Sequence, residues 1–548
     1  MTLPIDDKID VAQLEGSGDA IELADRVKYD AAQSAADRGQ HLSGYETLGI
    51  IETIMTFKMA AFICLAVTFS AATDGYQISM NGNVIANAGF VSRFATETDS
   101  TGARIIAAPI FSAWNVIQSI GQIIGMTTLP FFAARFGRKS AMYLYWLFLF
   151  ASVFCEAFAR HWQVWLVGKL FAGIGVGSMQ FTIPTYITEV SPVRIRGMML
   201  MLYNFWFSVG SFFAPVALQV MYKKNPENYL TPVYTQFAQI GLMILIYVVI
   251  PESPAWCVSI GKDEMGRKML ARINRGVKDF DVDAQYNILV QTVAHEQQLA
   301  EEQKREKWWN IFRGVNGFRT IVSMWALLAQ QFLGLGLFYS YSSYFFSSTG
   351  LEDPFLITVI TNAIQLAVIL LVVASVDRLG RRNICCSGLT ICWICNVAVG
   401  ILGVLSTTTE GKNTAFVFFC CVWIVGLQMS GSTGWGYVGE TSSQRLRAHT
   451  AGFSAACTCV VGVVMGVLVP YMLNANQFNW GLKTAWFFAG LGLPFTVLAW
   501  FIIPETARRS PAELDELFER KIRPWRFHKT QTATEVAVDA QQHVVSTH

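Results

Sequence analysis

Residues 189–196 read EVSPVRIR, and residues 440–447, which lie 251 positions later, read ETSSQRLR. Two further strings return at similar offsets. RFGRK at 135–139 is echoed by RLGRR at 378–382, and PES at 251–253 is echoed by PET at 504–506. Three motifs that recur with nearly one spacing indicate a chain built from two copies of one unit. The sequence therefore predicts two homologous halves.

The composition of the chain predicts that both halves lie in a membrane. Of 548 residues, 53% are hydrophobic and 15% are charged, against roughly 25% charged in soluble domains. Six apolar runs long enough to cross a bilayer come before a polar stretch and six come after it. They lie near 59–80, 109–132, 141–160, 162–186, 197–221 and 234–250, and near 321–346, 355–376, 384–405, 414–438, 449–472 and 482–503. We predict an all-α membrane protein of twelve transmembrane helices in two six-helix repeats.

The predicted domains follow from this alternation of polar and apolar segments. They are a polar N-terminal tail at 1–57, a first bundle at 58–251, a helical linker at 252–319, a second bundle at 320–503 and a C-terminal tail at 504–548. The loops after the second, fourth and eighth spans are basic, with Arg135, Arg138, Lys139, Arg194, Arg196, Arg378, Arg381 and Arg382. Such loops face the cytoplasm, so both termini and the linker are expected there and the acidic Glu352–Asp353 turn outside. We expect a multi-pass protein of the plasma membrane.

Several classes of protein are excluded by what the sequence lacks. The net charge is +2, from 41 basic and 39 acidic residues, so no patch for nucleic acid is expected. The 11 cysteines lie mostly in apolar runs, where packing is the better interpretation than metal binding. The sequence has no P-loop, G-x-S-x-G or H-E-x-x-H motif, so neither an enzyme nor a cofactor is expected. The polar start predicts no cleavable signal peptide.

A duplicated membrane chain of this kind is typical of secondary transporters, whose substrate binds between the repeats. We expect a monomer whose partners are the bilayer, a small-molecule substrate and, if transport is coupled, protons. The repeated motifs place acids beside bases at helix ends, which suits a latch between the halves. We predict that Glu189 meets Arg378 or Arg382 and that Glu440 meets Arg135 or Arg138. The motif residues Arg196, Arg447 and Asp377 join this cytoplasmic gate; the alternative is that the arginines only set orientation.

The chain resembles the sugar porter family of the major facilitator superfamily, most closely its fungal members, over residues 57–520. The matching strings are GKLFAGIGVGSMQFTIPTYITEVSPVRIRG at 168–197, PESPAW at 251–256, QQFLGLGLFYSY at 330–341, DRLGRR at 377–382, GSTGWGYVGETSSQRLR at 431–447 and PETARRSPAELDEL at 504–517. The resemblance implies the major facilitator fold and a sugar site between the halves.

The resemblance also implies which residues bind the substrate. Gln330 and Gln331 match the family's paired glutamines, Trp435 matches its tryptophan, and Asn204 and Gln365 stand where it has a glutamine and an asparagine. Amides donate to and accept from sugar hydroxyls, and an indole offers a flat apolar face. The alternatives are contacts between helices for the glutamines and core packing for Trp435.

Departures from the family pattern support a second hypothesis about the transported substrate. Gly336 replaces an asparagine, and Thr458 and Cys459 replace a glutamine and a tryptophan. A roomier pocket with fewer donors would suit a non-sugar metabolite, such as an organic acid or a secondary metabolite. A sugar sensor is a third hypothesis, against which the short C-terminal tail argues.

Energy coupling depends on the first span. Gln77 stands where proton-coupled members have an aspartate, and Lys169 stands where they have an arginine. An amide carries no proton, so facilitated diffusion is favoured over proton symport. Asp74, one helical turn from Gln77, is predicted to reach Lys169, where it would either carry protons or simply neutralise the lysine. Glu156 is predicted to be a surface group that extends to the membrane edge.

Overall fold

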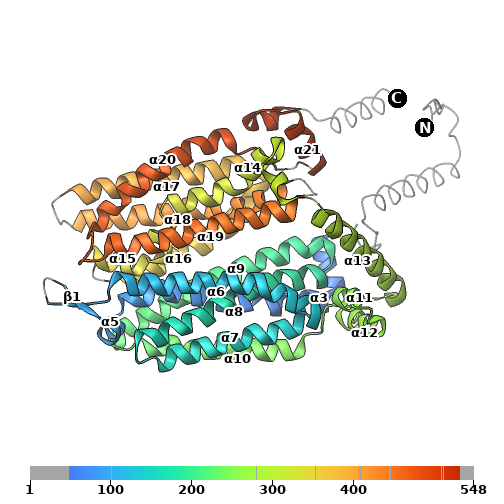
Figure 1. Ribbon diagram of the computed structural model, residues 1–548, viewed down its shortest axis with the longest axis horizontal. Helices are drawn as coiled ribbons and strands as arrows, with labels where there is room; N and C mark the ends of the chain where they lie inside the picture. The colour runs from blue at the N-terminus through green and yellow to red at the C-terminus, as the bar shows by residue number, and fades with distance from the viewer. Residues whose placement is uncertain are drawn as a thin grey trace.

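The computed structural model describes residues 49–99, 102–278, 280–305, 307–351, 353–405, 410–442, 446–507, 509 and 511–530, and nearly all of them are helical. Two helical bundles lie side by side, one from each half of the chain (Figure 1). Among the described residues, eleven helices are long and apolar enough to cross a membrane.

The first bundle contains α3 (Lys58–Thr68), α4 (Ser70–Asn83), α6 (Ala108–Phe136), α7 (Arg138–Phe158), α8 (Trp162–Val190), α9 (Val193–Lys224) and α10 (Leu230–Val249). The second contains α14 (Gly314–Phe332), α15 (Ser342–Ser348), α16 (Pro354–Leu379), α17 (Arg381–Val404), α18 (Glu410–Glu440), α19 (Arg447–Leu473) and α20 (Thr484–Ile502).

Shorter elements join or flank the bundles. Before the linker they are α2 (Ile50–Thr56), η2 (Val84–Ala86), α5 (Ala88–Phe94) and the antiparallel pair β1 (Glu97–Thr98) and β2 (Arg104–Ile105). The linker holds α11 (Pro254–Ser259), α12 (Asp263–Ile273), α13 (Val282–Arg305) and η3 (Trp308–Phe312). Later come η4 (Gly336–Ser340), η5 (Gly481–Lys483), α21 (Pro511–Glu519) and η6 (Pro524–Lys529).

The span expected near 321–346 is broken rather than continuous. Helix α14 ends at Phe332, Gly334 has a φ of +97°, and a short π-helical turn, η4, comes before α15. Glycine adopts this left-handed conformation without strain, so it can end the helix here. Because π-turns inside helices concentrate at functional sites, we infer that this span contributes to the functional site. Together with the eleven spans above, of which the first comprises α3, α4 and η2, it makes up the predicted twelve.

The repeated sequence strings meet in space within each half. The Glu252 carboxylate accepts from the backbone N–H groups of Arg138 (3.0 Å) and Lys139 (3.1 Å), so it caps the start of α7. Glu505 accepts in the same way from Arg381 (2.9 Å) and Arg382 (3.2 Å) at the start of α17. The PES and PET strings are therefore the acceptors for the RFGRK and RLGRR strings.

A second pair of equivalent contacts supports the duplication. The hydroxyl of Tyr186 donates to the carbonyl of Pro251 (2.7 Å), and that of Tyr437 donates to the carbonyl of Pro504 (3.1 Å). The helices are also packed by the same means as in other membrane proteins, through small residues at their crossings. At the crossing of α6 and α8, for example, a Cβ on Gly173 would collide with the backbone carbonyl of Gln118.

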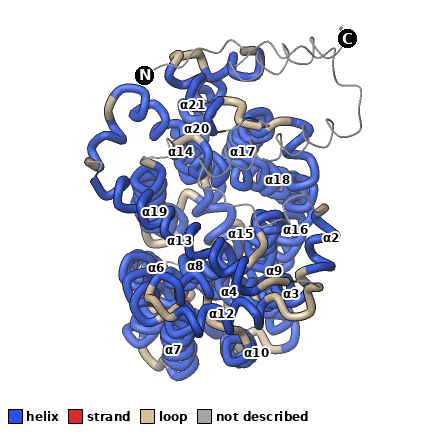
Figure 2. Tube along the Cα trace, turned by 90° about the vertical axis from the view of Figure 1, so that its right-hand side faces the viewer, coloured by secondary structure: helices blue, strands red, loops and turns tan. Residues whose placement is uncertain are grey.

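Both ends of the molecule can be defined from these contacts. We call the end that holds the loops of Arg138 and Arg381 the basic end, and the opposite one the far end. The linker helices lie at the basic end, which faces the viewer in Figure 2. Helix α21 lies there too, held by an ion pair between Arg319 and Asp515 (2.7 Å). The tail segments 1–48 and 531–548 lie outside the described residues.

Candidate functional site

A cavity of about 350 Å³ lies between the two bundles. It starts midway along the helices, at Gln330 and Gln365, and extends to Arg381 and Glu440 at the basic end. Its wall is formed by α9, α14, η4, α16, α18 and the first residue of α17, so both halves of the chain contribute. The lining residues are Met201, Asn204, Phe207, Ser208, Gln330, Leu335, Tyr339, Gln365, Ile369, Val372, Val373, Val376, Arg381, Leu427, Gln428, Gly431, Ser432, Thr433, Trp435, Gly436 and Glu440.

Four of the five predicted binding residues line this cavity. Gln330 Nε2 donates to Ser430 Oγ (2.9 Å) and more weakly to the carbonyl of Leu427 (3.3 Å). Gln365 is 4% exposed, and its Oε1 has no hydrogen-bond partner among the described residues. Asn204 and Trp435 line the cavity, and both side chains are exposed. A buried acceptor without a donor is costly, so a hydroxyl from a ligand would stabilise Gln365.

Gln331 does not line the cavity. Its amide lies near Gly462 of α19, where a Cβ on the glycine would come within 3.3 Å of Nε2. Consecutive residues on a helix point about 100° apart, so two neighbouring glutamines cannot face the same cavity equally. Of the two glutamines that the resemblance assigns to the substrate site, only Gln330 therefore lines the cavity.

Sequence reasoning did not select Tyr339, Ser208, Gln428, Ser432 and Thr433, which add further polar groups to the wall. Tyr339 donates to Ser211 Oγ (3.3 Å) and lies beside Gln365. In the sequence, these residues could have been recognised as amide and hydroxyl side chains inside apolar spans. Midway along the helices, the described lining residues carry no charge, and the ionic groups Arg381 and Glu440 lie at the basic end. The inner part of the cavity therefore suits a neutral molecule rich in hydroxyl groups.

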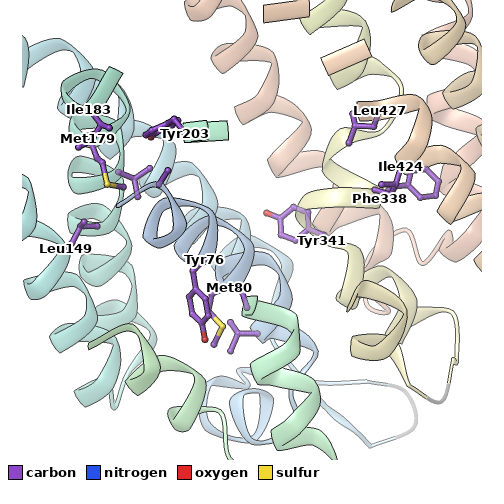
Figure 3. Packing of buried hydrophobic residues seen from close by; sticks show 14 of the residues in the cluster. Tyr76, Met80, Leu149, Met179, Ile183, Tyr203, Phe338, Tyr341, Ile424 and Leu427 are labelled. Carbon is purple, nitrogen blue, oxygen red and sulfur yellow. The ribbon is translucent and has the colours of Figure 1, made fainter. Parts of the chain in front are cut away.

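The two bundles are held together at the far end. Asn83 Oδ1 accepts from the backbone N–H of Ser343 (3.0 Å), and Asn474 Nδ2 donates to the carbonyl of Ile106 (3.1 Å). Nearer the middle, Asn362 Nδ2 donates to the carbonyl of Ser211 (3.0 Å). Figure 3 shows Tyr341 of the second bundle pointing toward the first. The cavity is thus closed at the far end and extends to the basic end.

The prediction that Asp74 reaches Lys169 is wrong. Lys169 Nζ lies 3.0 Å from Glu156 Oε1, and both side chains are 0% exposed. Glu156 is therefore not a surface group either. Gln77 Nε2 donates to the same oxygen (2.7 Å), which ties α4 to the ion pair between α7 and α8. Glu156 on α7 thus provides the counter-charge for Lys169 that was predicted to come from Asp74 on the first span.

Asp74 instead lies among neutral donors. It is 0% exposed, and its carboxylate accepts from Gln180 Nε2 (3.0 Å) and from the hydroxyl of Tyr203 (3.1 Å). No lysine or arginine among the described residues forms an ion pair with it. The next residue after Tyr203, Asn204, lines the large cavity. Asp74 is thus separate from Lys169 and linked to the cavity wall through α9.

The predicted partners of the gate glutamates are also wrong for this conformation. Glu189 pairs with Arg138 (2.7 Å), and Glu440 pairs with Arg381, so each acid is bound within its own half. Arg382 donates to the carbonyls of Trp500 (2.6 Å) and Ile503 (3.0 Å) instead. Among the described residues, no ion pair joins the two halves at the basic end, to which the cavity between the bundles extends.

The other gate residues have varied surroundings. Arg135 lies over the ring of Phe136, at 5.8 Å from its centroid, and Arg378 is exposed. Arg196 is near Glu296 of the linker helix α13. The Nε atoms of Arg196 and Arg447 have no hydrogen-bond partner among the described residues. The side chain of Asp377 lies outside the described residues.

Comparison with known proteins agrees with this architecture. Residues 63–518 match the family model described as "Sugar (and other) transporter". The chain is 26% identical to MFS transporter fmqE of Aspergillus fumigatus over 479 residues, which cover 86% of this chain and 87% of that protein. It is 26% identical to the general alpha-glucoside permease of Saccharomyces cerevisiae over 508 residues, which cover 90% and 81%.

Solved structures show the same fold. The inward-open conformation of the xylose transporter XylE from E. coli superposes with a TM-score of 0.68 at 19% identity, over 84% of this chain and 99% of that one. XylE bound to 6-bromo-6-deoxy-D-glucose, described as a major facilitator superfamily proton:xylose symporter, superposes with a TM-score of 0.63. The predicted all-α major facilitator fold is confirmed. With a family model that spans most of its length, the chain belongs to the sugar (and other) transporter family, whose members are membrane carriers and not enzymes.

Proposed function

We propose that the protein is a secondary transporter that moves a sugar or sugar-like polyol across a membrane by alternating access. The observation that carries the proposal is the uncharged inner cavity, where Gln330, Gln365 and Asn204 come together from both halves. Gln365 Oε1, which has no hydrogen-bond partner in the part of the chain that the structure describes, is an acceptor for a substrate hydroxyl. Trp435 adds an apolar face for the sugar's C–H groups.

Facilitated diffusion is the expected mode of transport. Gln77 cannot release a proton, and Glu156 is already engaged by Lys169 (3.0 Å), by Gln77 (2.7 Å) and by Ser152 Oγ (3.2 Å). These contacts assign Glu156 a structural role, which is to join α4, α7 and α8. We further propose a monomer in the plasma membrane, with the basic end and both termini in the cytoplasm.

A second cargo, a non-sugar metabolite, is supported by the aliphatic part of the wall. Ile369, Val372 and Val373 of α16 line the cavity between its amides and the basic end. These groups would contact an apolar portion of a substrate. One relative is named only as an MFS transporter, whereas another is named an alpha-glucoside permease.

Uptake measurements in a transport-deficient host test the proposal. Radiolabelled hexoses, pentoses, disaccharides and polyols are compared with organic acids and secondary metabolites. At least one sugar or polyol should show saturable uptake, and Gln330→Ala should raise its KM about tenfold, because a hydrogen bond to the substrate is lost. Gln331→Ala is the matched control, since Gln331 lies outside the cavity wall, and it should change KM less than twofold.

Two outcomes would contradict the proposal. The first is the absence of saturable uptake of every sugar and polyol by protein that reaches the membrane. The second is saturable uptake of an organic acid or secondary metabolite that no sugar inhibits, which would establish the second cargo instead.

A further inference from the structure

Helix α6 carries a polar stripe that the proposed site does not use. Asn115, Gln118, Ser119 and Gln122 are spaced three, four and seven residues apart, so they share one face of the helix. Ile123 and Ile124, at other angles, are exposed at about 40% each. Amides inside a membrane span are expensive unless they face water, a ligand or one another. The stripe therefore calls for a functional explanation.

The stripe lines a second, smaller cavity of about 110 Å³. Asn81 of α4 completes the first-bundle wall, and its Nδ2 donates to Gln118 Oε1 (2.5 Å). Ser340 and Tyr341 close the cavity from the second bundle. The cavity thus lies at the interface of the two halves, on the far-end side of the molecule.

A thin partition separates this cavity from the larger one. Tyr339 lines the large cavity, while the next two residues of the chain, Ser340 and Tyr341, line the small one. The Tyr341 hydroxyl donates to the carbonyl of Gly466 on α19 (3.1 Å), which holds the partition in place. Asn115 lies against the same Gly466. If the bundles separate at the far end, as alternating access requires, the stripe becomes the wall of the cavity on that side.

We propose that Asn81, Asn115, Gln118 and Gln122 form an outer subsite that binds hydroxyl groups of a neutral polyol when the carrier is open at the far end. This inference rests on the proposed function. The described lining residues carry no charge, and each amide can both donate and accept. At about 30 Å³ per water, the closed cavity has room for a few waters and not for a whole sugar. The closed subsite therefore has room only for water, and we expect substrate to enter it in the conformation that is open at the far end.

The test compares binding from the two sides of the membrane. The full-length protein is reconstituted in vesicles of known orientation, and KM is measured for entry of the best wild-type sugar from the far end and from the basic end. Gln122→Leu should raise KM for entry from the far end about five- to tenfold, the effect of one lost hydrogen bond. It should change KM from the basic end less than twofold. Gln118→Leu should act in the same way.

Thr128→Val is the matched control, because Thr128 is on the exposed face of α6 and bonds to its own helix at Ile124. Should Gln118→Leu fail to fold, since Asn81 loses its acceptor, the half-buried Gln122 still decides the result. A second readout is labelling of Ser119→Cys by a membrane-impermeant thiol reagent. Labelling from the far end should occur and should slow when the sugar is present.

An unchanged far-end KM in Gln122→Leu, or labelling that the sugar leaves unaffected, would overturn the subsite while leaving the proposed function intact. If wild-type protein moves no sugar or polyol at all, the proposed function fails first. The two failures are therefore distinguishable.

Discussion

In the first bundle, the acid that balances Lys169 lies on α7, as Glu156, and an amide, Gln77, lies at the position on α4 where an acid was expected. The resemblance predicts an acid at position 77, and the chain has Gln77 there with Glu156 on α7 beside it. Lys169 keeps its counter-charge although the acid has moved to another helix. The sequence could not reveal this, because Glu156 stands near a helix end and its direction depends on how α7 packs against α8. Gln331 shows the same limit, since its neighbour Gln330 reaches the cavity and it does not.

Glu156→Gln should therefore destabilise the protein strongly. It leaves the Lys169 ammonium buried without its counter-charge, which costs about 3–5 kcal/mol. The double variant Gln77→Glu with Glu156→Gln should recover much of that loss, because the two side chains are 2.7 Å apart and the acid stays near Lys169. Thermal unfolding in detergent measures both effects. Glu516→Gln, in the exposed pair of Glu516 with Arg520, is the control and should change stability little. Wild-type stability of Glu156→Gln would disprove the role of the pair.

At the scale of elements, the sequence predicted the helices and the repeat far better than their contacts. The spans were recognisable from apolar runs, and the repeated strings marked the helix ends. The predicted partners were wrong because the strings meet within each half, where Glu252 caps α7 and Glu505 caps α17. The break at Gly334 was also not foreseen, since the apolar run continues through it.

Glu252 gives a pH dependence that can be measured. Burial raises its pKa above the ordinary value of 4.5, although the backbone N–H groups of Ser253, Lys139 and Arg138 and the charge of Arg138 oppose this. The folded state then binds this proton more tightly than the unfolded state, so its contribution to stability is greatest below pH 4.5 and is lost as pH rises through the raised pKa. Glu252→Gln should remove this decline, by up to about 1.4 kcal/mol per pH unit within that window. Glu227→Gln, on an exposed loop, should leave the decline unchanged. If thermal unfolding between pH 4 and 7 gives parallel curves for wild type and Glu252→Gln, the prediction is wrong.

At the scale of the whole molecule, the two-bundle architecture was predictable and the conformation was not. The duplication and the apolar runs fix the number and order of the helices. Whether the bundles touch at the basic or the far end depends on a balance between contacts such as Asn83 with Ser343 and ion pairs at the other end. A carrier must populate both states, so its sequence has to be compatible with each of them.

Energy coupling is a property of the complete cycle, and Asp74 decides it. This carboxylate is buried, bonded to Gln180 and Tyr203, and without an ion pair among the described residues, so it is the acid of the first bundle best placed to exchange a proton. Glu156, which is also buried within the spans of this bundle, is paired with Lys169.

We expect facilitated diffusion, in which Asp74 serves only to join α4, α8 and α9. Wild-type vesicles should then equilibrate the sugar without accumulating it, and an uncoupler should change nothing. Asp74→Asn should keep exchange of internal for external substrate, as should the control Asp283→Asn in the linker. Accumulation that collapses on addition of an uncoupler, and that Asp74→Asn abolishes while exchange persists, would instead establish proton symport through Asp74.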